Sequence, residues 1–170
     1  MMETPRGMLN AAEIGAHPLM AGFVMGTNDL AKELQTRFRP DRLPLMTSLG
    51  LCLLAAKAEG LIIVDGGYNA FKDAEGLATE CEQGRDMGFD GKTLIHPAQV
   101  DVTNAAFAPS EIEIALARRQ IAAFEEGEAQ GQGVAVVDGK IVENLHVVTA
   151  RRNRAKAEAK TTRQAGGSRA

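Results

Sequence analysis

Three short apolar runs in the chain are each bounded by glycine or proline: MAGFVMG (20–26), LIIVDGG (61–67) and DGKTLIHP (90–97). Runs of this kind are typical of strands that are buried on both faces of a parallel sheet. We interpret the leading MMET (1–4) as the end of a fourth such strand, because Pro5 and Gly7 can then turn the chain into a helix. The pattern therefore predicts four strands.

The segments between these runs have helical periodicity. Helices are predicted over 10–17, 46–60, 73–88 and 109–131. The last of these begins with Ser110 followed by Glu113, the pattern of a capping box. Strands that alternate with helices predict βαβ units and a parallel sheet, so the predicted fold class is α/β.

Composition limits the possible partners and locations. The chain has 170 residues, of which 45% are hydrophobic and 24% charged, and its net charge is −3. No basic block precedes the tail, which argues against a nucleic-acid partner, and the longest apolar runs are shorter than the roughly 20 residues needed to cross a bilayer. We expect a soluble, cytoplasmic protein that binds neither nucleic acid nor membrane. Cys52 and Cys81 lack the spacing of metal ligands and are expected to be reduced thiols.

A polar residue follows each of the four apolar runs: Glu3, Asp29, Asp65 and His96. The carboxyl ends of parallel strands meet at one edge of a sheet, where α/β proteins carry their functional groups, so we expect these four side chains to line one rim. Each residue also has a purely structural interpretation. Glu3 could be a frayed terminal residue, Asp29 a first-turn acid, Asp65 a turn former and His96 a polar residue ahead of a proline.

The number of predicted strands is about half of what a (β/α)8 barrel contains. Half a barrel would leave two open edges and an exposed apolar interior, which is unfavourable for a soluble monomer. We therefore expect the chain either to be truncated or to pair with another chain.

Five motifs, in this order, carry a family resemblance: METPRGMLNAAEI, FVMGTNDLAKEL, LPLMTSLGLCLLAAKAEG, DMGFDGKTLIHPAQV and VVDGKIVENLHVVTARR. The chain resembles the C-terminal part of the HpcH/HpaI aldolase and citrate lyase β-subunit family, and within it the malyl-CoA lyase-like CoA ester lyases. The resemblance implies the C-terminal half of a (β/α)8 TIM barrel over residues 1–128. It also implies a C-terminal strand-helix extension over 129–158, and we expect a disordered tail over 159–170.

The resemblance implies a Mg²⁺-dependent lyase. Such an enzyme cleaves or forms a carbon–carbon bond beside a CoA thioester, converting a malyl-CoA-like substrate into glyoxylate, a 2-oxo acid, and acetyl-CoA. Glu3 and Asp29 match the family's metal-ligating carboxylates, and Mg²⁺ usually takes only one or two protein carboxylates. Gly7 would let a helix begin near the substrate carboxylate. We assign no role to the nearby cations Arg6 and Lys92.

In the family, a segment beyond the barrel supplies an acid to the neighbouring subunit's active site. Here the matching stretch is GKIVENLH (139–146), so Glu143 stands where an aspartate is usual, and Asn-Leu replaces a pair that ends in proline. The resemblance makes Glu143 the catalytic residue and implies a homo-oligomer. The alternative is that Glu143 is only an acid at the start of a helix. Asp138 is expected to be a turn residue.

Three functions remain open. In the lyase, which is the main expectation, Glu143 would move a proton on the acetyl-CoA carbon. In the alternative, a malyl-CoA thioesterase, the same carboxylate would activate a water that attacks the thioester. In the third, the chain is an inactive remnant or an assembly partner, because the first half of the family's barrel supplies further substrate contacts.

Overall fold

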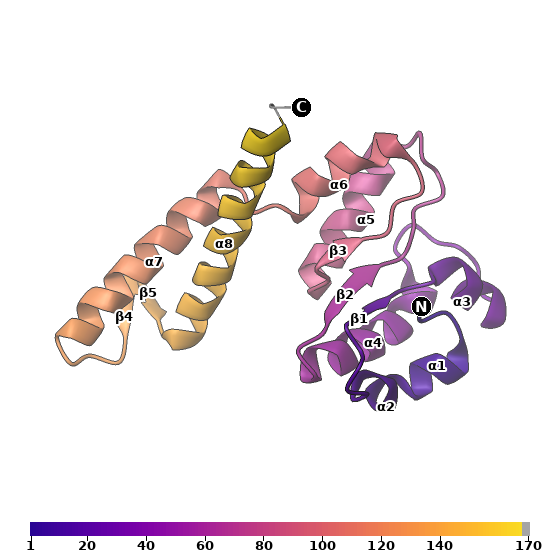
Figure 1. Ribbon diagram of the computed structural model, residues 1–170, viewed down its shortest axis with the longest axis horizontal. Helices are drawn as coiled ribbons and strands as arrows, with labels where there is room; N and C mark the ends of the chain where they lie inside the picture. Colours follow the sequence, from indigo (N-terminus) through magenta and orange to yellow (C-terminus); the bar gives the residue numbers. More distant parts are fainter. Residues whose placement is uncertain (168–170) are drawn as a thin grey trace. The chain divides into compact units, whose positions relative to one another are not determined.

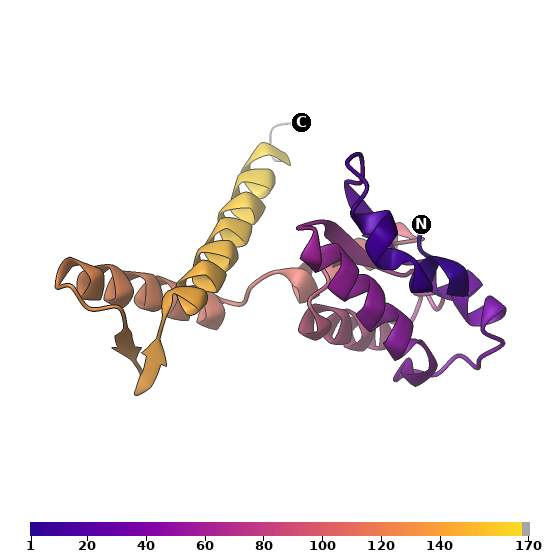
Figure 2. The ribbon, with the colours of Figure 1, turned by 90° about the horizontal axis from the view of Figure 1, so that it is seen from below.

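The computed structural model describes the backbone of residues 1–167 and the side chains of residues 1–159. It divides into two compact units, Met1–Phe107 and the residues from Ala108 onward, drawn from indigo to pink and from salmon to yellow in Figures 1 and 2. The division lies 21 residues before the expected domain boundary at residue 128, because the helix that follows Ser110 packs within the second unit.

The first unit contains a parallel sheet in the order β1 (Gly22–Val24), β2 (Ile62–Asp65) and β3 (Gly91–Lys92). Phe23 pairs with Ile63, and Asp65 pairs with Lys92. The leading residues add only an isolated parallel bridge, between Met2 and Met25. The α/β class and the parallel pairing are confirmed, while the fourth predicted strand is reduced to that bridge.

Six helices and two 3-10 turns complete the first unit as described: α1 (Pro5–Leu9), α2 (Ala11–Gly15), α3 (Thr27–Glu33), η1 (Leu43–Leu45), α4 (Met46–Ala58), α5 (Ala74–Met87), η2 (Pro97–Gln99) and α6 (Val100–Phe107). Side chains cap two of the α-helices. The Thr4 side chain accepts a hydrogen bond from the Gly7 N–H, and the Asp73 side chain accepts one from the Gly76 N–H. Such caps satisfy backbone donors that have no partner inside the helix.

The core of the first unit lies on one face of the sheet. Phe23, Met25 and Ile63 are buried there, and α4 packs against both β1 and β2. Successive strand residues point to opposite faces, and on the other face Ile62 is 62% exposed. Among the described residues, only one face of the sheet is therefore fully covered. Cys52 and Cys81 are buried and free, as expected.

The second unit is a helical hairpin with a β-hairpin between its arms: α7 (Glu111–Ala129), β4 (Ala135–Val137), β5 (Lys140–Val142) and α8 (Asn144–Gly167). The predicted capping box of Ser110 and Glu113 is present. Asp138 and Gly139 have positive φ angles of 51° and 73°, which suit a tight hairpin turn and confirm Asp138 as a turn residue.

The helix α8 buries only part of its apolar side chains. Val147 and Ala150 are buried in a cluster with Ile121 and Phe124, whereas Leu145 and Val148 are exposed. The expected disordered tail begins within α8, whose backbone continues to Gly167, and residues 168–170 lie outside the described part. No helix in the described part is long and apolar enough to cross a membrane.

Candidate functional site

Glu3 lies directly after the bridge that joins the leading residues to the end of β1. The Gly26 N–H donates to the Met2 carbonyl at 2.7 Å, which brings Glu3 over Gly26. A Cβ built on Gly26 would stand 2.5 Å from Glu3 Cβ and 2.8 Å from Glu3 Oε2. Only glycine leaves room for the glutamate at this position, so the two residues form a matched pair.

Asp29 lies in the first turn of α3, and Gly26 is the N-cap of this helix. The Glu3 carboxylate therefore rests against the start of the same helix that carries Asp29. Neither carboxylate has an ion pair with any described residue, and Asp29 is exposed. The structure thus places both predicted ligands near the carboxyl end of β1, beside the start of α3.

The donor set on this rim fits a hard divalent cation. No group of three or more His, Cys, Asp or Glu side chains in the described residues is arranged to hold a metal. Mg²⁺ does not need such a group, since it commonly takes one or two carboxylates and fills its remaining positions with water and substrate oxygens. Glu3 and Asp29 supply oxygen donors of this kind, and their role as metal ligands stays a prediction.

Asp65 has a different environment, although it also follows a strand. Its side chain is fully buried, and its Oδ2 accepts from Arg42 Nη1 at 2.6 Å and from Lys92 Nζ at 3.3 Å. Its Oδ1 accepts from the Gly66 N–H at 2.8 Å. Lys92 Nζ also donates to Glu80 at 2.5 Å. Asp65 and Lys92 thus belong to a buried ionic network beneath the rim.

Arg42 and Glu80 are members of this network that the sequence analysis did not single out. The side chain of Arg42 is 5% exposed, its Nε donates to Gln83 Oε1 at 2.6 Å, and the Arg42 backbone has φ +52°. A non-glycine residue in this left-handed region is uncommon and signals a constrained backbone. Arg42 therefore ties the loop before η1 to β2 and to α5. The polar stretch TRFRPDR gives no local signal that this particular arginine is buried.

His96 stands at the start of η2. Its Nδ1 accepts from the Ala98 N–H at 3.1 Å, and its ring lies 4.5 Å from that of Phe71. The imidazole is thereby engaged in fixing the turn before Pro97. Gly7 is similar, because its N–H donates to the Thr4 side chain at 3.1 Å and is already used within the helix start.

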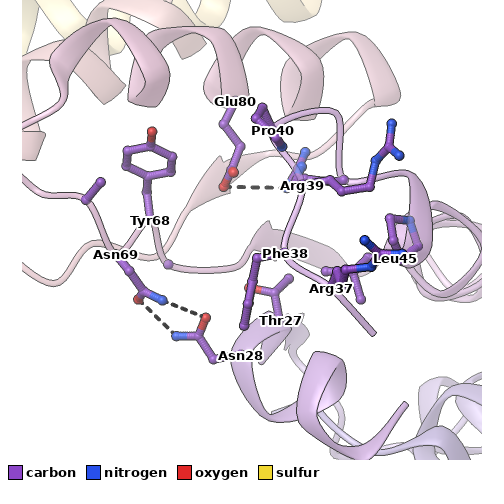
Figure 3. A pocket seen from close by; sticks show the side chains of 14 residues that line it. Thr27, Asn28, Arg37, Phe38, Arg39, Pro40, Leu45, Tyr68, Asn69 and Glu80 are labelled. Carbon is purple, nitrogen blue, oxygen red and sulfur yellow. Dashed lines mark hydrogen bonds and ion pairs between the residues drawn. The ribbon is translucent and has the colours of Figure 1, made fainter. Parts of the chain in front are cut away.

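A pocket of about 340 Å³ opens beside the first turn of α3. Figure 3 shows Asn28 and Asn69 in contact at one side of it, with Tyr68, Phe38 and Glu80 elsewhere in its wall. The Tyr68 hydroxyl donates to Asp73 at 2.7 Å, and this hydrogen bond raises the pKa of Tyr68 to about 12.

On the loop of the same pocket, Arg39 is paired with Asp41, and the hydrogen bond from Arg39 lowers the pKa of Asp41 to about 2. Arg37 also lines this pocket and has no ion-pair partner among the residues described. The pocket wall is therefore basic on its loop side.

Glu143 belongs to the second unit, where it stands just before α8 and is exposed. Its N–H donates to His146 Nδ1 at 3.0 Å, and its carbonyl accepts from the His146 N–H at 2.9 Å. These contacts place Glu143 at the helix start, which the structural alternative anticipated. They leave its carboxylate available to solvent, and its catalytic role stays a prediction.

A parallel sheet carries, at its carboxyl edge, two carboxylates that have no ion pair with any described residue. The molecule is therefore an α/β protein with a candidate divalent-cation site. Residues 1–97 match the family model described as HpcH/HpaI aldolase/citrate lyase. The chain belongs to this family, as its motifs indicated.

Relatives and solved structures agree with this assignment. The chain is 76% identical, over 94% of its length, to the (3S)-malyl-CoA thioesterase of Cereibacter sphaeroides, and 35% identical, over 89% of its length, to the citrate lyase subunit beta of Leuconostoc mesenteroides. It spans 56% and 50% of these two proteins. Among solved structures, the chain is similar to CitE from Mycobacterium tuberculosis in complex with magnesium, acetoacetate and coenzyme A. The match has a TM-score of 0.80 and 31% sequence identity, and it covers 91% of this chain and 58% of the CitE chain.

These comparisons correct the expected reaction. The prediction of a carbon–carbon lyase is wrong, because the relative that shares about three quarters of its residues with this chain is a thioesterase, which is a hydrolase. The citrate lyase subunit beta has only about one third of its aligned residues identical to this chain. The alternative, hydrolysis of malyl-CoA, is the better supported of the two enzymatic expectations.

Proposed function

We propose that this chain forms part of a malyl-CoA thioesterase, which hydrolyses malyl-CoA to malate and free CoA. The observation that carries this proposal is the 76% identity, over 94% of the chain, to the Cereibacter sphaeroides enzyme of that name. Because the chain spans 56% of that relative, the activity is proposed for the complete assembly rather than for these residues by themselves.

Within that assembly, we propose that residues 1–128 form the C-terminal half of a (β/α)8 barrel and that 129–158 form the extension. Two features support the half-barrel: the parallel order of β1, β2 and β3, and the exposed Ile62 on the uncovered face of the sheet. In a barrel this face would be the packed interior. The enzyme is proposed to be a homo-oligomer.

Glu3 and Asp29 would hold Mg²⁺ in the working enzyme. Their oxygen donors, their lack of other ion pairs among the described residues and the glycine that makes room for Glu3 support this role. When bound, the metal would supply positive charge for oxygen atoms of the malyl group. The structure of CitE in complex with magnesium is consistent with this assignment at the level of the family.

Glu143 is proposed to be the general base, acting on the active site of a neighbouring subunit. Its carboxylate takes a proton from a water molecule as the water oxygen forms a bond to the thioester carbonyl carbon. The carbon–sulfur bond then breaks, the electron pair leaves with sulfur, and the proton ends on the thiol of CoA. General acid–base help of this kind typically contributes about 10²–10⁴-fold to the rate.

The products of malyl-CoA test the reaction. We expect one equivalent of free thiol and one of malate, with no glyoxylate, when the chain is joined to the upstream half of the Cereibacter sphaeroides relative. Glyoxylate formation with acetyl-CoA would contradict the proposal. The chain alone is expected to have little activity and to self-associate, and a fully active monomer would disprove the need for a further half.

Variants test the proposed general base and the proposed metal ligand separately. In the joined enzyme, Glu143→Ala should lower the rate by about 10²-fold or more, whereas Glu128→Ala, a change of an exposed acid elsewhere in the second unit, should not. Asp29→Asn should abolish Mg²⁺ binding in titration calorimetry.

Mixing Glu143→Ala subunits with Asp29→Asn subunits should restore part of the activity that each lacks. No restoration would exclude a site shared between subunits.

A further inference from the structure

Two asparagines join the first turn of α3 to the loop after β2. Asn28 Nδ2 donates to Asn69 Oδ1 at 3.0 Å, and Asn69 Nδ2 donates to Asn28 Oδ1 at 2.9 Å. The reciprocal pair is drawn with two dashed lines in Figure 3. Asn28 lies in the first turn of α3, immediately before Asp29, and Asn69 lies in the loop after β2. The pair therefore connects the candidate metal ligand to the adjacent βα loop.

A close backbone approach joins the same two segments. A Cβ built on Gly66 would stand 2.2 Å from Thr27 Oγ1 and 2.6 Å from Thr27 Cγ2. Thr27 is buried and is the first residue of α3. The end of β2 thus presses against the helix start at a place where only glycine fits, and the asparagine pair closes the contact on the exposed side.

The helix α3 is short and has no side-chain cap, so it does little to fix its own first turn. α3 has seven residues, and its N-cap Gly26 makes no side-chain capping hydrogen bond. Helices of this length are unstable in isolation and depend on tertiary contacts for their position. Leu30 and Ala31 anchor the middle of α3 in the core, and Thr27 and Asn28 hold its first turn, which carries Asp29.

We infer that Asn69 is a positioning residue for the metal site: by holding Asn28, it fixes the first turn of α3 so that the Asp29 carboxylate stays on the rim beside Glu3. This inference rests on the metal site proposed above. Partners that orient ligands in this way usually affect metal affinity much more than they affect folding, since an exposed amide pair contributes little to global stability.

Titration calorimetry with Mg²⁺ on the full chain tests the role of Asn69. Asn69→Ala is expected to weaken binding by about tenfold, with no change in the thermal unfolding midpoint. Asn28→Ala should weaken it equally, and the double variant should be no weaker than either single variant, because both remove one pair. Tyr68→Phe, which removes a hydrogen bond in the same loop and leaves the pair intact, is the matched control and should bind like the wild type.

Hydrogen exchange supplies a readout that needs no metal. Exchange of the amides of α3 (27–33) should accelerate in Asn69→Ala and stay unchanged in Tyr68→Phe. Unchanged exchange, or equal Mg²⁺ affinity in Asn69→Ala and wild type, would overturn the inference. If the wild-type chain binds no Mg²⁺, the metal site of the preceding proposal fails, and with it the metal-positioning role, while the exchange of α3 still decides whether the asparagine pair holds the helix start.

Discussion

The change Asp65→Asn removes one charge from the buried network under the rim while nearly keeping the size of the side chain. Asp65 is fully buried and accepts from both Arg42 and Lys92. The carboxylates of Asp65 and Glu80 together compensate the positive charges of Arg42 and Lys92. Glu80 lies 3.7 Å from Arg42 and 2.5 Å from Lys92. After the substitution, one carboxylate faces two buried cations.

The expected loss of stability is large. Removing one partner of a buried ion pair costs about 3–5 kcal/mol, because an uncompensated charge stays in the interior. A small domain has a total unfolding free energy of only about 5–15 kcal/mol. For a domain of this size, each kcal/mol corresponds to about 4–8 °C, so the unfolding midpoint should fall by at least about 12 °C.

The chain offers a convenient probe for this experiment. It contains one tyrosine, Tyr68, and no tryptophan, so tyrosine fluorescence during thermal unfolding reports on the first unit. The control is Asp41→Asn, which breaks the exposed pair between Arg39 and Asp41. Exposed pairs contribute little to stability, so this variant should unfold close to the wild type. Equal midpoints for Asp65→Asn and Asp41→Asn would refute the reasoning about burial.

Three further predictions concern single side chains. In Asp73→Asn, the pKa of Tyr68 should fall from about 12 toward 10, which near-ultraviolet absorbance of the tyrosinate measures directly. Burial raises the pKa of Cys52 from 9.0 to about 11, so the folded state keeps its proton longer than the unfolded chain. The stability present below pH 9 should be lost as the pH rises toward 11, and Cys52→Ala should flatten that loss in urea midpoints measured across this range. Gly26→Ala should displace Glu3 and weaken Mg²⁺ binding, and unchanged affinity in that variant would remove Glu3 from the site.

The elements that the sequence predicted well are those with a local signal. Apolar runs that end at glycine identified β1 and β2, and the Ser110–Glu113 spacing identified the start of α7. Such patterns depend on residues within one turn or one strand, which is why they can be read without knowledge of the fold. The proposed metal ligands came from the family motifs together with the order of the strands.

The missed features depend on contacts between distant residues. Arg42 and Asp65 are 23 positions apart, and Asp65 and Lys92 are 27 apart. Nothing in either local stretch shows that their charges compensate each other in the interior. The same limit explains α8, where the buried Val147 and Ala150 are selected by the position of α7 and not by the pattern of apolar residues alone.

The prediction of the wrong reaction has a chemical explanation. Lyase and thioesterase would use the same acid at the position of Glu143, and they differ in whether that carboxylate moves a proton on carbon or on water. That choice depends on whether a water molecule can reach the thioester, which no residue type in the motif specifies. The motifs consequently identified the family, while the identity to a malyl-CoA thioesterase was needed to correct the reaction.

The distribution of charge on the first unit supports the cation site proposed for the rim. The carboxylates of Asp65 and Glu80 are neutralised by Arg42 and Lys92, so the network beneath the rim contributes little net field. Glu3 and Asp29 lack such partners among the described residues. Two carboxylates held on one rim repel each other unless a positive charge lies between them. The fold thus neutralises the acids that hold its loops together and leaves uncompensated the two acids that the family motifs assign to the metal.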